Sequence, residues 1–184
     1  MTALAIIAAV IVLAAVFVIS LYNGMVKGRN LVEEAWSGVS IQLKRRHDLV
    51  PNLVSTVQGY AAHERSVYEA VTQARAASLG ASGVQGVAEA EKGLSAALGR
   101  LFAVAEAYPE LKADANFRNL QDNLANIEDE LQMARRYYNG TARDQNNRIQ
   151  QFPGNLFASA FGFRKVEYFE LDSEAERAVP KVSF

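Results

Sequence analysis

Residues 44–48, with the sequence KRRHD, combine four side chains that can carry positive charge with one carboxylate. A histidine beside an aspartate is typical of metal-dependent hydrolases, in which His47, Asp48 and the second histidine, His63, would act together. Such sites need further ligands from other elements, and neither histidine belongs to a two-histidine zinc motif. The chain also has no cysteine and no Gly-x-Ser-x-Gly motif, so the sequence carries no signal for thiol or serine-hydrolase chemistry. We expect no catalytic, metal-binding or cofactor-binding residues.

The same basic residues could instead bind nucleic acid or lipid, but their spacing predicts a structural role. Successive helix positions lie about 100° apart, so four consecutive charges spread around a helix instead of forming one face. Arg46 falls on an apolar stripe, where a buried guanidinium needs an acidic partner from a facing helix. The formal net charge of −1 also argues against bulk electrostatic binding to nucleic acid.

A long first helix is predicted to position these residues. Its apolar stripe, at steps of three and four, comprises Val32, Ala35, Trp36, Val39, Leu43, Arg46, Val50, Leu53, Val57 and Tyr60. The stripe continues through Pro51, which removes one backbone hydrogen bond and crowds the carbonyl of His47. Because the register survives, the sequence predicts one proline-kinked helix, or two helices nearly in line.

Two further apolar stripes predict an all-α protein. One contains Leu94, Leu98, Leu101, Ala105 and Tyr108, and the other contains Phe117, Leu120, Leu124, Ile127, Leu131, Ala134, Tyr138 and Thr141. The second stripe is coiled-coil-like and is expected to end at Pro153. The glycine-rich residues 78–86 predict a connection between helices. We therefore expect an antiparallel bundle over residues 27–153, with four helices when the proline-interrupted segments are counted separately.

Residues 1–26 contain no charged side chain, and residues 3–22 form an apolar run. A helix of this length rises about 30 Å, the thickness of the hydrocarbon core of a bilayer. A cleaved signal peptide is the rival interpretation, but a basic start and a short apolar core are not seen. We expect a retained single-pass anchor. Because Lys27 and Arg29 follow the run, the positive-inside rule predicts an N-terminus outside and a cytoplasmic C-terminal domain.

Residues 154–184 differ from the bundle by their aromatic side chains, among them Phe157, Phe161, Phe163, Tyr168 and Phe169. So many aromatic rings are costly to expose to water, so we expect this tail to fold back and cover the bundle. Contact with a partner or a membrane surface is the alternative. Residues 116–155 are rich in Asn and Gln, whose amides suit interhelical hydrogen bonds or a polar docking surface.

Several motifs resemble those of the LemA family, and they follow one another along nearly the whole chain. They are AWS at 35–37, QLKRRHDLVPNLV at 42–54, RLFAVAEAYPELK at 100–112, Tyr138-Asn139, FPGNL at 152–156, FGF at 161–163 and PKVSF at 180–184. Ser40, Gln145 and the acidic pair Asp129-Glu130 depart from the family pattern. The resemblance implies one membrane helix and a helical bundle in a bacterium. It links some members to building or remodelling membrane compartments such as magnetosomes, and it does not imply an enzyme.

The sequence thus favours a non-enzymatic scaffold at the bacterial inner membrane that is anchored in lipid through residues 1–26 and associates with itself. Other membrane proteins are further expected partners. A regulatory partner of a membrane protease or transporter is the first alternative, and a metal-dependent hydrolase using His47, Asp48 and His63 is the second. The residues expected to matter for structure or interaction are Trp36, Arg46, Asp48, Pro51, Asn139 and Pro153.

Overall fold

The computed structural model describes residues 1–170, and every regular element in that range is a helix. The helices are α1 (Thr2–Gln58), α2 (Arg65–Gly80), α3 (Val84–Glu106), α4 (Pro109–Ala113), α5 (Ala115–Gln150) and α6 (Gly154–Phe157). The predicted all-α fold is confirmed for these residues. The end of the predicted tail, including the PKVSF motif at 180–184, lies outside the described range.

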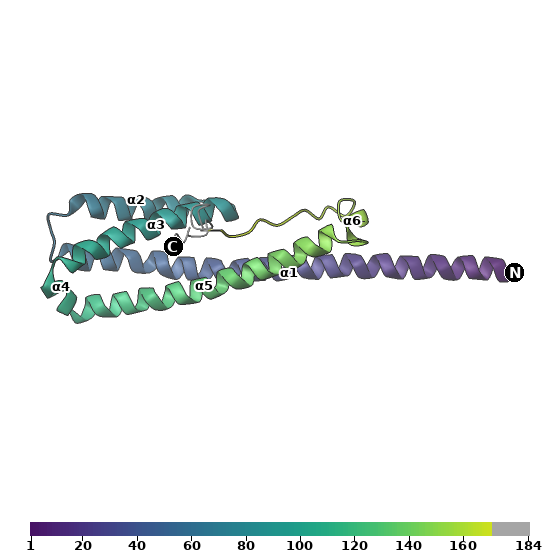
Figure 1. The fold of residues 1–184 in the computed structure, drawn as a ribbon, viewed down its shortest axis with the longest axis horizontal. Helices are drawn as coiled ribbons and strands as arrows, with labels where there is room; N and C mark the ends of the chain where they lie inside the picture. The colour runs from purple at the N-terminus through teal and green to yellow at the C-terminus, as the bar shows by residue number, and fades with distance from the viewer. Residues whose placement is uncertain (171–184) are drawn as a thin grey trace, which may run out of the picture.

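Helix α1 joins the apolar run to the bundle without interruption (Figure 1). Pro51 lies inside α1, and the helix continues past it to Gln58. The structure therefore shows one helix here and not two helices in line. Val50, Leu53 and Val54, which flank the proline, are all buried. Their packing offsets the one backbone hydrogen bond that Pro51 cannot make, because burying an aliphatic side chain stabilises by about 1.5–3 kcal/mol.

The bundle consists of α1, α2, α3 and α5, with consecutive long helices running in opposite directions (Figure 1). At the end farthest from the N-terminus all four helices enclose one core, which includes Leu53, Val71, Leu94, Leu101 and Phe117. Asp114 begins α5 by accepting a hydrogen bond from the Phe117 amide (2.8 Å), which is an N-cap. The short α4 connects α3 to this cap.

Helices α2 and α3 are shorter than α1 and α5, so they cover only part of the α1–α5 pair (Figure 1). The predicted connection at 78–86 is also shorter than expected, because α2 extends to Gly80 and α3 begins at Val84. After α6 the chain runs back along α1 and α5 (Figure 1). Residues 163–170 are here called the extended segment. Its residues Val166 and Phe169 join Val39, Leu131 and Tyr138 in a second core.

A third core lies where the apolar run meets the bundle. It comprises Met25, Ile149, Ala158 and Phe163, with Val26 packed against it. The predicted boundary at residue 26 therefore falls inside a packed contact. The residues before Tyr22 are mostly exposed, and α1 is the one described helix that is long and apolar enough to cross a membrane.

Candidate functional site

An ion pair between Arg46 of α1 and Glu91 of α3 lies at the centre of the bundle. Arg46 Nη1 is 2.6 Å from Glu91 Oε2, and the two residues are 2% and 0% exposed. The stripe of the first helix predicts both the burial of Arg46 and its acidic partner, and the structure shows both. Glu91 is on the matching stripe of α3, three residues after Ala88 and three before Leu94.

Arg46 also connects α1 to a second residue of α3 and to α5. Its Nη2 donates to Ser95 Oγ at 2.8 Å, and its Nε lies 2.7 Å from Glu128 Oε1. The planar guanidinium presents donors in fixed directions, so one side chain can hold partners on two helices. A lysine would offer only a single point of charge, so it could not bind these partners on α3 and α5 in the same way.

His47, Ser78 and Glu91 form the other side of the same cluster. His47 Nε2 is 2.6 Å from Glu91 Oε1 and 3.0 Å from Ser78 Oγ, and Ser78 also donates to Glu91. In a serine hydrolase the acid holds one ring nitrogen and the serine uses the other. Here both groups meet the same nitrogen and all three side chains are buried. The arrangement therefore differs from a catalytic triad and links α1, α2 and α3 through one buried network.

The network changes the ionisation of Glu91. Burial alone would raise its pKa, but hydrogen bonds from His47 and Ser78 and the charge of Arg46 together lower the pKa below its usual range. Arg135 of α5 lies beside the cluster, with its guanidinium 5.1 Å above the Phe169 ring. Burial, with the positive charge of Arg46, lowers the pKa of Arg135.

The lowered pKa of Glu91 predicts a pH dependence of stability. A carboxylate with a lower pKa in the folded state stabilises the fold above its unfolded pKa, and this stabilisation is lost as pH falls through the folded pKa. We expect the urea midpoint of the full chain in mild detergent to fall from about pH 6 to about pH 3, and to fall less steeply in Glu91→Gln. The exposed Glu89→Gln is the matched control and should keep the wild-type slope. Equal slopes in all three proteins would contradict this assignment.

The proposed hydrolase residues do not form one site. His47 and Asp48 both line a groove of about 400 Å³ beside Trp36 and Ser78. Asp48 also lines a larger groove, of about 650 Å³, with Asp129 and Glu130 of α5. His63 lies exposed in the loop between α1 and α2 and lines neither groove. Among residues 1–170, no group of three or more His, Asp or Glu side chains is placed to hold a metal ion.

Two asparagines of α5 hold the extended segment by its backbone. The Asn139 side chain donates to the Phe169 carbonyl (3.0 Å) and accepts from the Phe169 amide (2.8 Å). Asn146, two helical turns later, makes the same pair of bonds with Val166, at 2.9 and 2.8 Å. We call Asn139 and Asn146 the asparagine clamp. Each amide satisfies both backbone groups of one residue, which a side chain of another type cannot do as well.

Tyr138 and Trp36 lie beside the asparagine clamp and contact the extended segment that it holds. Tyr138 donates its hydroxyl to the Glu167 carbonyl at 2.9 Å. Burial, with the Glu167 charge, raises the pKa of Tyr138 to about 12, so its hydroxyl remains a donor. Trp36 packs against the rings of Tyr138 and Phe169, with centroids 5.3 and 6.0 Å away. Asn139 was a candidate from its motif, whereas Asn146 stood out only as part of the amide-rich stretch.

Pro153 and Gln145 belong to the end of the bundle nearest the apolar run. Pro153 lies between the end of α5 and the start of α6. Gln145 donates to the Met25 carbonyl at 3.1 Å, and Arg148 donates to the Gly24 carbonyl at 2.6 Å. These bonds attach α5 to the part of α1 that follows the apolar run. Sequence reasoning noted Gln145 only as a departure from the family pattern, and it missed Glu91 and Arg148.

Comparison with known proteins gives consistent relatives. Residues 35–184 match the family model described as "LemA family". Magnetosome protein MamQ 1 of Paramagnetospirillum magneticum is 27% identical over 175 residues, which cover 81% of this chain and 64% of MamQ 1. MamQ of Magnetospirillum gryphiswaldense is 27% identical over 174 residues, covering 80% and 64%. Protein LemA of Metamycoplasma hominis is 26% identical over 157 residues, covering 84% of this chain and 71% of that protein.

This chain therefore spans 64% of the length of the MamQ relatives, so part of each MamQ protein has no counterpart in the alignment. The family model, by contrast, matches well over half of this chain. The match and the exposed apolar start of α1 together indicate a membrane-associated helical protein. The chain belongs to the LemA family.

Proposed function

We propose that this protein is a non-enzymatic, membrane-anchored scaffold that presents a rigid helical bundle to partners at the bacterial inner membrane. The observation that carries this proposal is the continuity of α1. Its first residues are apolar and exposed, and from Met25 onward the same helix enters the core. A helix without a break transmits orientation, so the bundle stands in a fixed direction relative to the anchor.

The polar groups of the bundle also support a structural role. Arg46, His47 and Glu91 satisfy one another in the interior, and the asparagine clamp binds the chain's own backbone. Both arrangements satisfy most of their hydrogen-bonding groups within the chain itself. The MamQ relatives are named magnetosome proteins, which fits a role in membrane organisation for this chain as well. Lys27 and Arg29, after the apolar run, favour a cytoplasmic bundle.

Crosslinking of the full chain in its own membrane, followed by mass spectrometry, tests the scaffold proposal. We expect crosslinks between copies and to other membrane proteins, from lysines on exposed faces such as Lys27 and Lys44. Crosslinks to one protease or transporter alone, with no self-contact, would favour the regulatory-partner alternative. Hydrolysis of a substrate by the purified full chain would overturn the non-enzymatic assignment.

We further expect the full chain to be a homo-oligomer in nanodiscs. The apolar run carries the small residues Ala5 and Ala9, which let two helices approach closely in lipid. Confinement to one surface also raises the effective concentration of the bundles. Mass photometry should show oligomers for the wild type and fewer for Ala5→Leu/Ala9→Leu, with Val10→Leu, on another face of the helix, as the control. A monomer at every protein concentration would remove self-association and leave binding to other proteins.

A further inference from the structure

We propose that residues 152–163, here called the interfacial segment, form a second membrane-contact site that lies in the headgroup region and prefers anionic lipid. This inference rests on the proposed anchoring by the apolar run of α1. It adds that the chain returns to the same bilayer surface after α5. The membrane contact would then involve two segments separated by more than a hundred residues of sequence.

The position of the interfacial segment along α1 is set by direct contacts. The Tyr22 ring lies 5.2 Å from the Phe161 ring and 5.8 Å from the Phe163 ring, centroid to centroid. Phe152 and Pro153 line a groove of about 280 Å³ together with Ser20 and Leu21 of α1. The segment is therefore level with the last residues of the apolar run (Figure 1).

This level corresponds to the headgroup region when the apolar run crosses a bilayer. The headgroup region is about 5–8 Å thick on each side, which a helix crosses in about four or five residues. Residues 20–25 of α1, which contact the segment, fall at this boundary. Tyrosine and other amphipathic aromatic residues are enriched at this depth in membrane proteins.

Three large apolar side chains of the interfacial segment are exposed, beside the exposed polar residues Asn155 and Ser159. Phe152 is 79% exposed and Leu156 is 61% exposed, and Phe161 is also exposed. The inward side is already packed, because Ala158 and Phe163 are buried against Met25 and Ile149. The exposed side chains therefore do not take part in the third core. They form a separate apolar surface beside the anchor.

The backbone keeps this surface in place. The Ala158 amide donates to the Gly154 carbonyl and the Phe163 amide donates to the Ala158 carbonyl, both at 2.9 Å. Gly154 is packed against the backbone of Arg148, where a Cβ atom would overlap the carbonyl oxygen. Phe157 stacks on Phe161 at 6.2 Å. Phe152 and Leu156 are therefore presented from a fixed turn and not from a loose chain end.

The charge around the interfacial segment indicates the kind of lipid. Five basic residues lie near it: Arg148, Arg164 and Lys165 are close to it in sequence, the Arg29 guanidinium is 5.8 Å from the Phe163 ring, and Lys27 follows Met25 on α1. No Asp or Glu occurs in residues 1–32 or 145–166. The opposite end of the bundle carries Glu64, Glu110 and Asp114 in its connections. A basic, aromatic end suits anionic headgroups, since each basic side chain near such a surface contributes about 1 kcal/mol of attraction.

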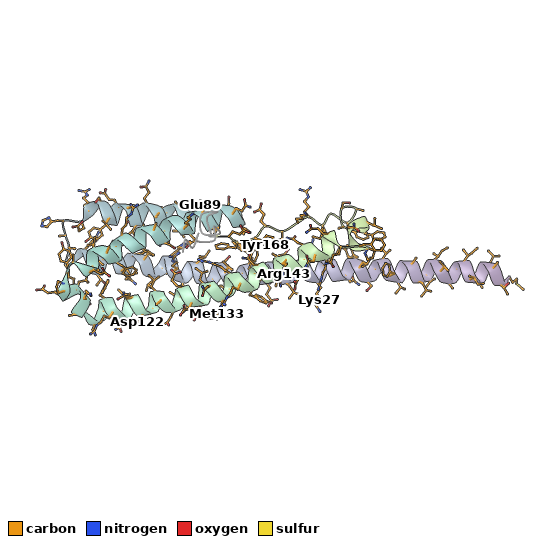
Figure 2. The ribbon with its side chains drawn as sticks, viewed as in Figure 1. Lys27, Glu89, Asp122, Met133, Arg143 and Tyr168 are labelled. Carbon is orange, nitrogen blue, oxygen red and sulfur yellow. The ribbon has the colours of Figure 1, made fainter. Side chains whose placement is uncertain are left out.

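Site-specific labelling of the full chain in nanodiscs tests this proposal. The chain has no cysteine, so single-cysteine variants can carry an environment-sensitive fluorophore without background. The test positions are Phe152→Cys and Leu156→Cys. Met133→Cys, on α5 away from this end (Figure 2), is the exposed control, and Val12→Cys reports the anchor. All four positions are more than half exposed, at 79%, 61%, 54% and 59%.

Brominated phospholipid, which quenches only fluorophores that it touches, provides the readout. We expect loss of most of the fluorescence at positions 152, 156 and 12, and no loss at 133. Quenching at 12 without quenching at 152 and 156 would overturn the interfacial segment and leave the anchor intact. Absence of quenching at 12 would overturn the anchoring itself. A crosslinked protein covering positions 152 and 156 in place of lipid would show that this surface binds a protein instead.

The lipid preference has its own comparison. Quenching at 152 and 156 should be deeper in nanodiscs that contain phosphatidylglycerol than in phosphatidylcholine alone, and added salt should reduce the difference. Arg164→Gln/Lys165→Gln should remove it. Arg143→Gln, an exposed arginine beside Asp144 on α5 (Figure 2), is the matched control and should not. Equal quenching in both lipids would overturn the anionic preference.

Discussion

Arg46→Ala is expected to lower the free energy of unfolding by about 3–5 kcal/mol, because it leaves the buried Glu91 carboxylate without its cation. The variant also removes the contacts of Arg46 with Ser95 and Glu128, so the contacts of α1 with both α3 and α5 weaken. Urea unfolding of the full chain in mild detergent, followed by circular dichroism, measures the change. A loss of this size would leave a protein of ordinary stability barely folded.

The neighbouring basic residues provide matched controls. Lys44 is exposed, and Arg45 forms an ion pair with Glu130 in which both side chains are largely exposed. Lys44→Ala and Arg45→Ala should each cost at most about 1 kcal/mol. The loss of unfolding free energy in Arg46→Lys should lie between these values and that of Arg46→Ala. Lysine keeps the positive charge but lacks the planar guanidinium that binds several partners. Equal, small shifts for all the variants would show that the basic run is a surface patch.

The double variant Asn139→Ala/Asn146→Ala is expected to release the extended segment from the bundle. It removes four hydrogen bonds to backbone groups, which at about 1 kcal/mol each raise the opening equilibrium by up to about 1,000-fold. Hydrogen exchange measured by mass spectrometry or NMR should show fast exchange at Val166 and Phe169, because their amides donate hydrogen bonds to the side-chain oxygens of the two asparagines. The amides of α3 should keep their protection, because the first core does not involve these asparagines.

Asn147→Ala is the control for the asparagine clamp. Asn147 is exposed and adjoins Asn146, so it tests the same helix propensity without touching the segment. Asn139→Asp is a sharper variant, since it keeps the acceptor for the Phe169 amide and loses the donor to the Phe169 carbonyl. We expect exchange at Phe169 to be intermediate. Unchanged protection in the double variant would mean that Phe169 and Val166 hold the segment by packing alone.

Helix positions and the burial of Arg46 could be predicted from the sequence, since both follow from periodicity within one segment. The stripe through Leu53 and Val57 survives Pro51, and the structure shows a continuous helix there. The identity of the acid that faces Arg46 depends on how α1 and α3 align. The apolar stripe of one helix carries no information about this alignment. Extending the stripe of Leu94 and Leu98 backwards by three residues nevertheless reaches Glu91, a charged residue at an apolar position.

Other features depend on partners that leave no side-chain pattern. The asparagine clamp binds backbone groups, so the sequence of the bound segment carries no matching signal. Glycines and serines make up most of residues 78–86, and this composition predicts a longer turn than the structure shows. Ser78 instead remains in α2, where its bonds to His47 and Glu91 satisfy its hydroxyl in the interior. Tertiary contacts outweigh local propensity at this position.

The uninterrupted α1 has a mechanical consequence. From Tyr22 to Gln58 the helix extends about 54 Å beyond the apolar run. If the run crosses a bilayer at a tilt of about 20°, the far tip of the bundle lies about 18 Å to the side of the anchor. Helices change their tilt to match the thickness of the surrounding lipid. In that case the protein would act as a lever arm, converting a difference of a few ångströms in bilayer thickness into a much larger sideways displacement of the far end of the bundle.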